Sequence, residues 1–181
     1  MSRSARRWWD RWADAQGRPP GARDRAFDHD RARASDDAAE LPTPVTTERV
    51  VELLTGRGFH VEADADGDVV GAWDHHRFWF LLLGPDRTVP QVRGRWHRSL
   101  PLGMRGIALQ AANDWNRDHA FPKVYVRPAA DELRIYAEVS ADLTFGATAQ
   151  QLGRLLDCGL LTGLQVFSVL DAALPQPAGE G

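Results

Sequence analysis

The chain has 181 residues, of which 43% are hydrophobic and 26% are charged, values that are ordinary for a soluble globular protein. This length allows one domain with an appendage, and the formal charge of -3 argues against a general nucleic-acid binder. The single cysteine, Cys158, excludes an intrachain disulfide and a zinc site built from cysteines. Because no apolar run reaches the roughly 20 residues that span a bilayer, and no secretory signal follows the basic N-terminus, we expect a cytoplasmic protein without stable membrane insertion.

Residues 1–44 differ in composition from the rest of the chain. Alternating Arg and Asp with few aliphatic residues predict a disordered tail. Within it, Trp8 and Trp12 are spaced i, i+4 and would share one face of a short helix that also carries Trp9. This helix is either a frayed end or a docking element for the protein's own body, a partner or a membrane surface. The three tryptophans are therefore candidate docking residues.

The folded domain is expected at residues 45–172. Its first helix is capped by Thr46 or Thr47 and ends at Gly56 and Gly58. Short turns then separate four predicted strands, at residues 59–63, 69–73, 77–83 and 89–97. The third of these, RFWFLLL, is apolar on both parities, which indicates a central strand covered on both faces.

The second half of the domain is predicted to be helix, hairpin and helix. Pro101 fits the first turn of a helix that ends before Pro122, and two strands at 123–127 and 133–139 follow as a hairpin. The last helix begins with a capping box at Thr148, and its glycines, Gly159 and Gly163, are candidate positions for a split into two helices. Residues 173–181 are rich in Pro and Gly and predict a flexible tail. The order α-β(3–4)-α-β-β-α predicts an α+β fold with an antiparallel sheet and helices packed on one face.

Several segments together resemble a known family. QVRGRW, NDWN, FPKVYVR, RIYAEV and GLLTGLQVFSVL are similar to the corresponding parts of YbjN-domain proteins, which are bacterial proteins described as sensory transduction regulators. The resemblance covers residues 45–170. It implies a fold like that of type III secretion chaperones, frequent dimers, and a non-enzymatic regulator or adaptor role.

We find no constellation of residues typical of an enzyme. The adjacent His75 and His76 would point to opposite faces of a strand, and the remaining histidines lack a partner at ligand spacing. In DADGD, Gly67 falls at position four, whereas a calcium loop has its Gly at position six, so a hairpin turn is favoured. Cys158 lies in an apolar run and is expected to be a buried structural thiol. The sequence therefore predicts no catalytic residue, no metal site and no cofactor.

The alternation of residues in three strands predicts a polar sheet face. Val92 and Trp96 share one parity, whereas Arg93, Arg95, Gln91 and His97 share the other. The two-sided strand adds Trp79 or Phe80, and Glu138 is the one acid expected there. A polar outer face of a one-sided sheet is normal, but cations with aromatic insets also suit a binding surface. The candidate partner or ligand face is Arg93, Arg95, Lys123, Tyr125, Arg127, Arg134 and Tyr136.

Leu109, Asn113 and Asn116 lie beside the apolar stripe of the middle helix. Asn116 can fix the turn at Phe121 and Pro122, because Asn prefers helix ends. Alternatively, all three belong to a dimer or ligand contact.

These features predict a regulatory or chaperone-like binding module that recognises a protein segment, forms a homodimer, or does both, with no nucleic-acid partner. The alternative is a small-molecule sensor whose ligand lies between sheet and helices near Trp96 and Trp115. A partner binder should show an exposed patch of arginine and aromatic residues, and a sensor should show an enclosed pocket.

Overall fold

The structure, a computed structural model, describes residues 40–174. The candidate docking residues Trp8, Trp9 and Trp12 and most of the predicted tail at 173–181 lie outside them. The elements in chain order are α3 (Thr47–Thr55), β1 (Glu62–Ala63), β2 (Val69–Trp73), β3 (His76–Leu83), β4 (Val89–Pro101), a 3-10 turn η1 (Leu102–Met104), α4 (Arg105–Asp118), β5 (Lys123–Ala129), β6 (Glu132–Ser140) and α5 (Ala149–Ala173).

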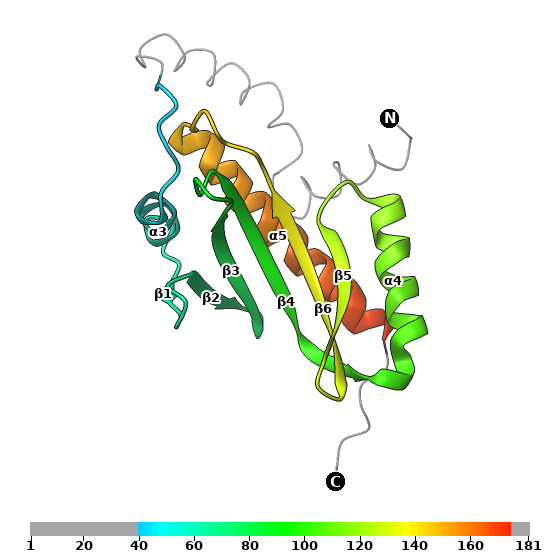
Figure 1. Ribbon diagram of the computed structural model, residues 1–181. Helices are drawn as coiled ribbons and strands as arrows, with labels where there is room; N and C mark the ends of the chain where they lie inside the picture. The colour runs from blue at the N-terminus through cyan, green and yellow to red at the C-terminus, as the bar shows by residue number, and fades with distance from the viewer. Residues whose placement is uncertain (1–39, 175–181) are drawn as a thin grey trace, which may run out of the picture. The chain divides into compact units, whose positions relative to one another are not determined.

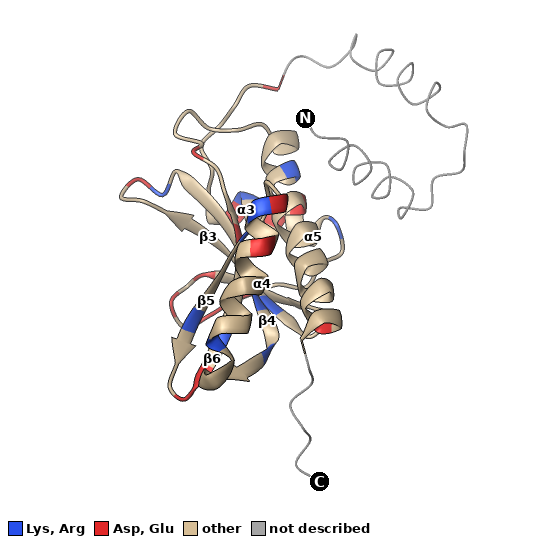
Figure 2. Cartoon of the chain, turned by 90° about the vertical axis from the view of Figure 1, so that its right-hand side faces the viewer, with Lys and Arg blue, Asp and Glu red and all other residues tan. Residues whose placement is uncertain are grey.

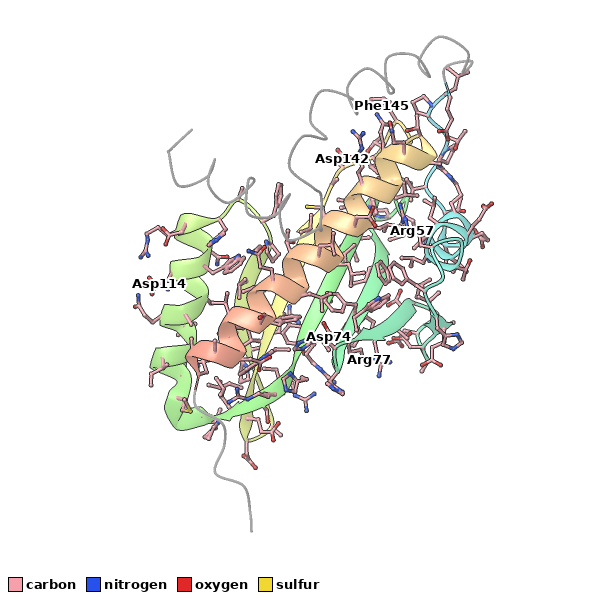
Figure 3. The ribbon with its side chains drawn as sticks, turned by 180° about the vertical axis from the view of Figure 1, so that it is seen from behind. Arg57, Asp74, Arg77, Asp114, Asp142 and Phe145 are labelled. Carbon is pink, nitrogen blue, oxygen red and sulfur yellow. The ribbon has the colours of Figure 1, made fainter. Side chains whose placement is uncertain are left out.

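The six strands form one antiparallel sheet in the order β1-β2-β3-β4-β6-β5. Helix α5 crosses behind β3, β4 and β6, and α4 packs against the edge strand β5 (Figure 1). Seen from behind, α5 lies in front of the sheet, and α3 lies beside the N-terminal half of α5 (Figure 3). The predicted α+β architecture with helices on one face is confirmed. We call the uncovered side of the sheet the open face.

The core lies between the sheet and the helices. On β3 and β4, the side chains of Phe78, Phe80, Val92 and Trp96 alternate inward and are almost fully buried. Phe167 of α5 packs on Phe78 with ring centroids 5.9 Å apart. Burial of these apolar surfaces supplies the main driving force for folding, and it fixes which parity of each strand faces the open side.

Helix α5 is continuous over 25 residues, so the predicted split at its glycines is wrong. Both glycines face the sheet: a methyl group on Gly159 would overlap Val92, and one on Gly163 would lie 2.8 Å from Phe78. They are used for close approach and do not end the helix. The predicted capping box at Thr148 is confirmed. By length and composition alone α5 could cross a membrane, but here its apolar side is buried in the domain core.

The folded contacts begin before α3. Thr43 forms an isolated bridge with Ala147, and Arg49 donates hydrogen bonds to the carbonyls of Thr43, Pro44 and Ala147 at 2.7 to 2.9 Å. Thr46 caps α3 as predicted, because its hydroxyl accepts from the Arg49 N–H at 3.3 Å. The segment just ahead of α3 is therefore fastened to the start of α5.

Strand β4 is longer than predicted and is irregular near its end. Its pairing with β6 shifts register between Arg95 and Ser99. The alternation predicted His97 on the open face, but the structure places its Nδ1 4.0 Å from Asp171 of α5. The prediction for His97 is wrong because a bulge adds residues to one strand and breaks the period of two.

Candidate functional site

A row of side chains crosses four strands of the open face. Trp79, Arg93, Glu138 and Lys123 are successive register partners on β3, β4, β6 and β5. Glu138 lies between the two cations, 3.6 Å from Arg93 Nε and 3.2 Å from Lys123 Nζ. Arg93 also donates to the side-chain oxygen of Gln91. Arg93 is therefore paired within the sheet, with a carboxylate that it shares with Lys123.

The next row places cations over aromatic rings. The guanidinium carbons of Arg77 and Arg95 lie 5.2 and 5.7 Å from the ring centroid of Trp79. Arg127 lies 5.4 Å from the ring of Tyr125, which stacks on Tyr136 at 5.5 Å. Within residues 40–174, neither Arg95 nor Arg127 forms an ion pair with a carboxylate. A guanidinium that lies over a ring keeps its in-plane N–H groups available for an anion.

These residues surround a hollow of about 370 Å³ on the open face. Its lining comes from the β1–β2 turn and from strands β3, β4, β5 and β6, and in Figure 2 the basic residues colour parts of β4 and β5. We call it the open-face hollow. It is lined by Asp64, Asp66, Asp68, Trp79, Leu81, Leu83, Arg93, Arg95, Tyr125, Arg127 and Tyr136.

The β1–β2 turn forms one wall of the hollow. Oδ1 of Asp64 accepts the backbone N–H groups of Asp66 and Asp68 at 3.0 and 3.1 Å, and its Oδ2 accepts the indole N–H of Trp79 at 3.2 Å. Asp64 is thus a structural residue, and the predicted hairpin turn is confirmed. Asp66 and Asp68 form no ion pair with any described residue. Burial, followed by the nearby Asp64 and Asp66, raises the pKa of the Asp68 carboxyl.

The structure brings most of the predicted face together. Five of its residues line the hollow, whereas Lys123 and Arg134 lie on the same parity outside the lining; Arg134 is 3.8 Å from Glu132. Trp79 takes the open face and Phe80 the core. Sequence reasoning missed the aspartate wall, Arg77, Leu81 and Leu83. The alternation of β3 could have assigned the last three, but nothing local indicates that the turn folds over the sheet.

Comparison with known proteins supports this architecture. Residues 46–172 match the family described as "YbjN: Putative bacterial sensory transduction regulator". The chain belongs to the YbjN family. A crystal structure of YbjN from E. coli, whose title calls it "a putative transcription regulator", superimposes with a TM-score of 0.64 at 12% identity, over 75% of this chain and 99% of that chain. Comparison with curated proteins returns no match. The likeness to type III secretion chaperones stays a prediction.

A histidine cluster in this YbjN domain was missed by sequence reasoning. His76, His97 and Asp171 offer ligand atoms within 4.8 Å of one another. However, His76 Nδ1 accepts the backbone N–H of His97 at 3.0 Å, so the neutral ring carries its proton on Nε2 and has no second lone pair for a metal. Asp171 also accepts the indole N–H of Trp96 at 3.0 Å. The cluster therefore joins β3, β4 and α5 as a hydrogen-bonded structural contact.

The three candidate residues of α4 have different surroundings in the YbjN domain. Asn116 pairs with the backbone of Val124 in both directions, donating to its carbonyl and accepting its N–H at 2.8 Å each. This contact holds the start of β5 against the end of α4, across the turn that contains the cis Phe121–Pro122 bond. Asn113 and Leu109 are exposed on α4. A dimer or ligand contact by these residues stays a prediction.

Cys158 is half-buried on α5, somewhat more accessible than the sequence predicts. Burial raises the pKa of its thiol, so at neutral pH it carries less thiolate than a free cysteine. Its surroundings favour a structural residue over a nucleophile.

Proposed function

We propose that this YbjN-family protein is a non-enzymatic regulatory binding module whose open face binds a short acidic segment of a partner protein. The observation that carries the proposal is the pair Arg95 and Arg127, which lie over aromatic rings without a carboxylate partner among the described residues. Their charges are held in place and lack the compensation that Glu138 gives to Arg93. Such guanidinium groups bind carboxylates through paired N–H donors.

The size and chemistry of the hollow support a short bound segment. Its volume of about 370 Å³ lies within the range of ligand pockets, about 300 to 1,000 Å³, and Tyr125, Tyr136 and Trp79 offer apolar surface beside the cations. Its lining includes no Ser, Cys, His or Lys that could act as a nucleophile with an adjacent base. Burial raises the pKa of Tyr125 to about 12, so its phenol stays protonated at neutral pH. These features favour recognition over bond chemistry.

The alternative, a small-molecule sensor, is less well supported at the predicted place. Trp96 and Trp115 belong to the buried core cluster between sheet and helices, with 1% and 7% of their surface exposed. The open-face hollow lies on the other side of the sheet. A small acidic molecule could use the same two arginines, so the experiment must separate a peptide from such a ligand.

The test is to pan a random octapeptide library against the full chain and against two charge-matched variants. Arg95→Gln with Arg127→Gln removes the proposed contacts, and Arg105→Gln with Arg154→Gln removes two exposed arginines from α4 and α5 as a control. We expect the wild type and the control to enrich acidic peptides, and the hollow variant to lose this enrichment while its circular dichroism is unchanged.

Equal enrichment by all three proteins, or none by the wild type, would contradict the proposal. Free glutamate and citrate serve as competitors, and displacement of enriched peptides at micromolar concentration would favour the sensor. Self-association through the open face is tested with the same proteins by sedimentation velocity. A dimer that only the hollow variant loses would show that a second copy is a partner.

A further inference from the structure

The charges in the open-face hollow are separated across the sheet. Asp66 and Asp68 come from the turn between β1 and β2, at one edge of the strand order β1-β2-β3-β4-β6-β5. Arg127 comes from β5, the opposite edge strand. Arg95 lies on β4 and is the register partner of Tyr136 on β6, which itself pairs with Tyr125 of β5. The hollow therefore has an acidic end and a basic end.

The middle of the hollow holds a cation that already has a carboxylate partner, beside apolar side chains. Arg93 is compensated by Glu138, and Trp79 is held between the two ends by its bond to Asp64 and by Arg95 over its ring. Near the acidic end, Leu81 and Leu83 complete the lining. Because Val69 pairs with Phe80, the turn that precedes Val69 lies along this half of β3. An extended segment in the hollow would thus meet cations at one end and carboxylates at the other.

We propose that the open-face hollow selects its segment by the order of charges: it accepts one acidic side chain at Arg95 and Arg127 and excludes a second one near Asp66 and Asp68. This inference rests on the proposed function and adds the partner's charge pattern to it. Like charges that meet in a binding site weaken the complex with the wrong segment. The complex with the right segment does not bring such charges together, so the repulsion generates specificity. Runs of acidic residues and nucleic-acid backbones are then poor ligands, although the hollow contains arginines and aromatic rings.

The geometry of the aspartates makes the selection testable. Asp64 must be left intact because both of its oxygens hold the wall. Asp66→Asn with Asp68→Asn removes two charges at nearly constant shape, and neither side chain donates or accepts a hydrogen bond that holds the turn. The turn bonds that involve these residues use their backbone groups, such as the Asp64 N–H to the Asp68 carbonyl at 2.9 Å.

The experiment measures the fluorescence polarisation of labelled octapeptides with the full chain. One probe carries a single Glu among Ala, Tyr and Ser; two others add a second Glu four residues before or after it. A ten-residue oligothymidylate is the nucleic-acid probe. We expect the wild type to bind the single-Glu probe at least about fivefold more tightly than one of the two-Glu probes. The aspartate variant should bind the single-Glu probe and that two-Glu probe with affinities within about twofold of each other. Its affinity for the single-Glu probe should equal that of the wild type.

Three results would overturn the inference: two-Glu probes bound as tightly as the single-Glu probe in both placements, an affinity ratio that the aspartate variant leaves unchanged, or oligothymidylate bound as tightly as the single-Glu probe. The proposed function fails in a different way. If Arg95→Gln with Arg127→Gln leaves single-Glu binding at the wild-type level, the hollow is not the acidic-segment site.

Discussion

Trp79 donates its indole N–H to Asp64 over 3.2 Å, although the two residues are 15 positions apart in the chain. The other oxygen of the same carboxylate holds two backbone N–H groups of the β1–β2 turn. One side chain thus shapes the turn and fastens it to β3. The acidic wall of the open-face hollow depends on this single carboxylate.

Substitution of Asp64 should separate these two roles. Asp64→Ala removes all three hydrogen bonds and is expected to destabilise the domain by about 1 to 3 kcal/mol, since it leaves partly buried donors without an acceptor. Asp64→Asn keeps a carbonyl oxygen for the turn, so its loss of stability should be clearly smaller. Urea unfolding monitored by circular dichroism measures both. If the two variants are equally unstable, the turn bonds are not the main contribution.

Glycine packing between α5 and the sheet should be intolerant of a methyl group. In Gly159→Ala the new Cβ would overlap Val92, and such overpacking costs about 1 to 3 kcal/mol despite the better helix propensity of Ala. Gly106→Ala in α4 is the matched control, because nothing lies within 4 Å of its added methyl. It should stabilise the domain by up to about 1 kcal/mol. Thermal melts of both variants measure the effect. Equal shifts of the melting temperature would contradict close packing at Gly159.

The Asn116 contact predicts a loss of stability without a change in association. Asn116→Ala removes both hydrogen bonds to Val124 and is expected to cost about 1 to 3 kcal/mol. Asn113→Ala, at an exposed position of the same helix, should stay within about 0.5 kcal/mol of the wild type. Calorimetry and sedimentation on both variants provide the measurements. A monomer–dimer shift in Asn113→Ala would instead support the predicted dimer contact.

His76 should make the domain less stable in mild acid. Burial, and next the neighbouring His97, lower its pKa in the folded state, while Asp171 and Asp74 act in the opposite direction. A depressed histidine pKa means that the unfolded chain binds the proton more readily. Stability is therefore full above the unfolded value of about 6.5 and declines as the pH falls from there toward the folded pKa.

The matched variant is His76→Asn, whose side-chain oxygen can accept the His97 N–H in place of Nδ1. Urea unfolding at pH 7.5 and pH 5.5 should show a smaller decline for the variant than for the wild type. An equal decline in both proteins would assign the pH dependence to other groups.

The sequence predicts the open face well because alternation is a local property. Arg93, Arg95, Tyr125 and Tyr136 share a parity in regular strands. The apolar run of β3 correctly predicts an inner strand of the sheet. The predicted cover on both of its faces is wrong among the described residues, because α5 packs on one face and Trp79, Leu81 and Leu83 line the hollow on the other. The bulge in β4 defeats the same rule at His97, because the extra residues between Arg95 and Ser99 interrupt the alternation locally. Beyond the bulge the alternation resumes, and Leu100 is buried on the same parity as Trp96. Periodicity holds only while the pairing is regular.

Other features depend on contacts distant in sequence. The sequence predicts the aspartate turn but not its contact with the sheet, because its partner, Trp79, belongs to another strand. The glycines of α5 read as helix ends because their neighbours, Val92 and Phe78, lie on the sheet. The cluster of His76, His97 and Asp171 draws on three separate elements. No spacing within one segment could have revealed these contacts.

Glu138 gives the open face a further property. It contacts Arg93 and Lys123 from the centre of the sheet, yet it does not belong to the lining of the hollow. Exchange of this one carboxylate for an amide would remove the ion-pair partner of both cations without changing the identity of any lining residue. If the open face binds an acidic segment as proposed, exchange of Glu138 would change the affinity for that segment and its salt dependence through a residue outside the lining of the hollow.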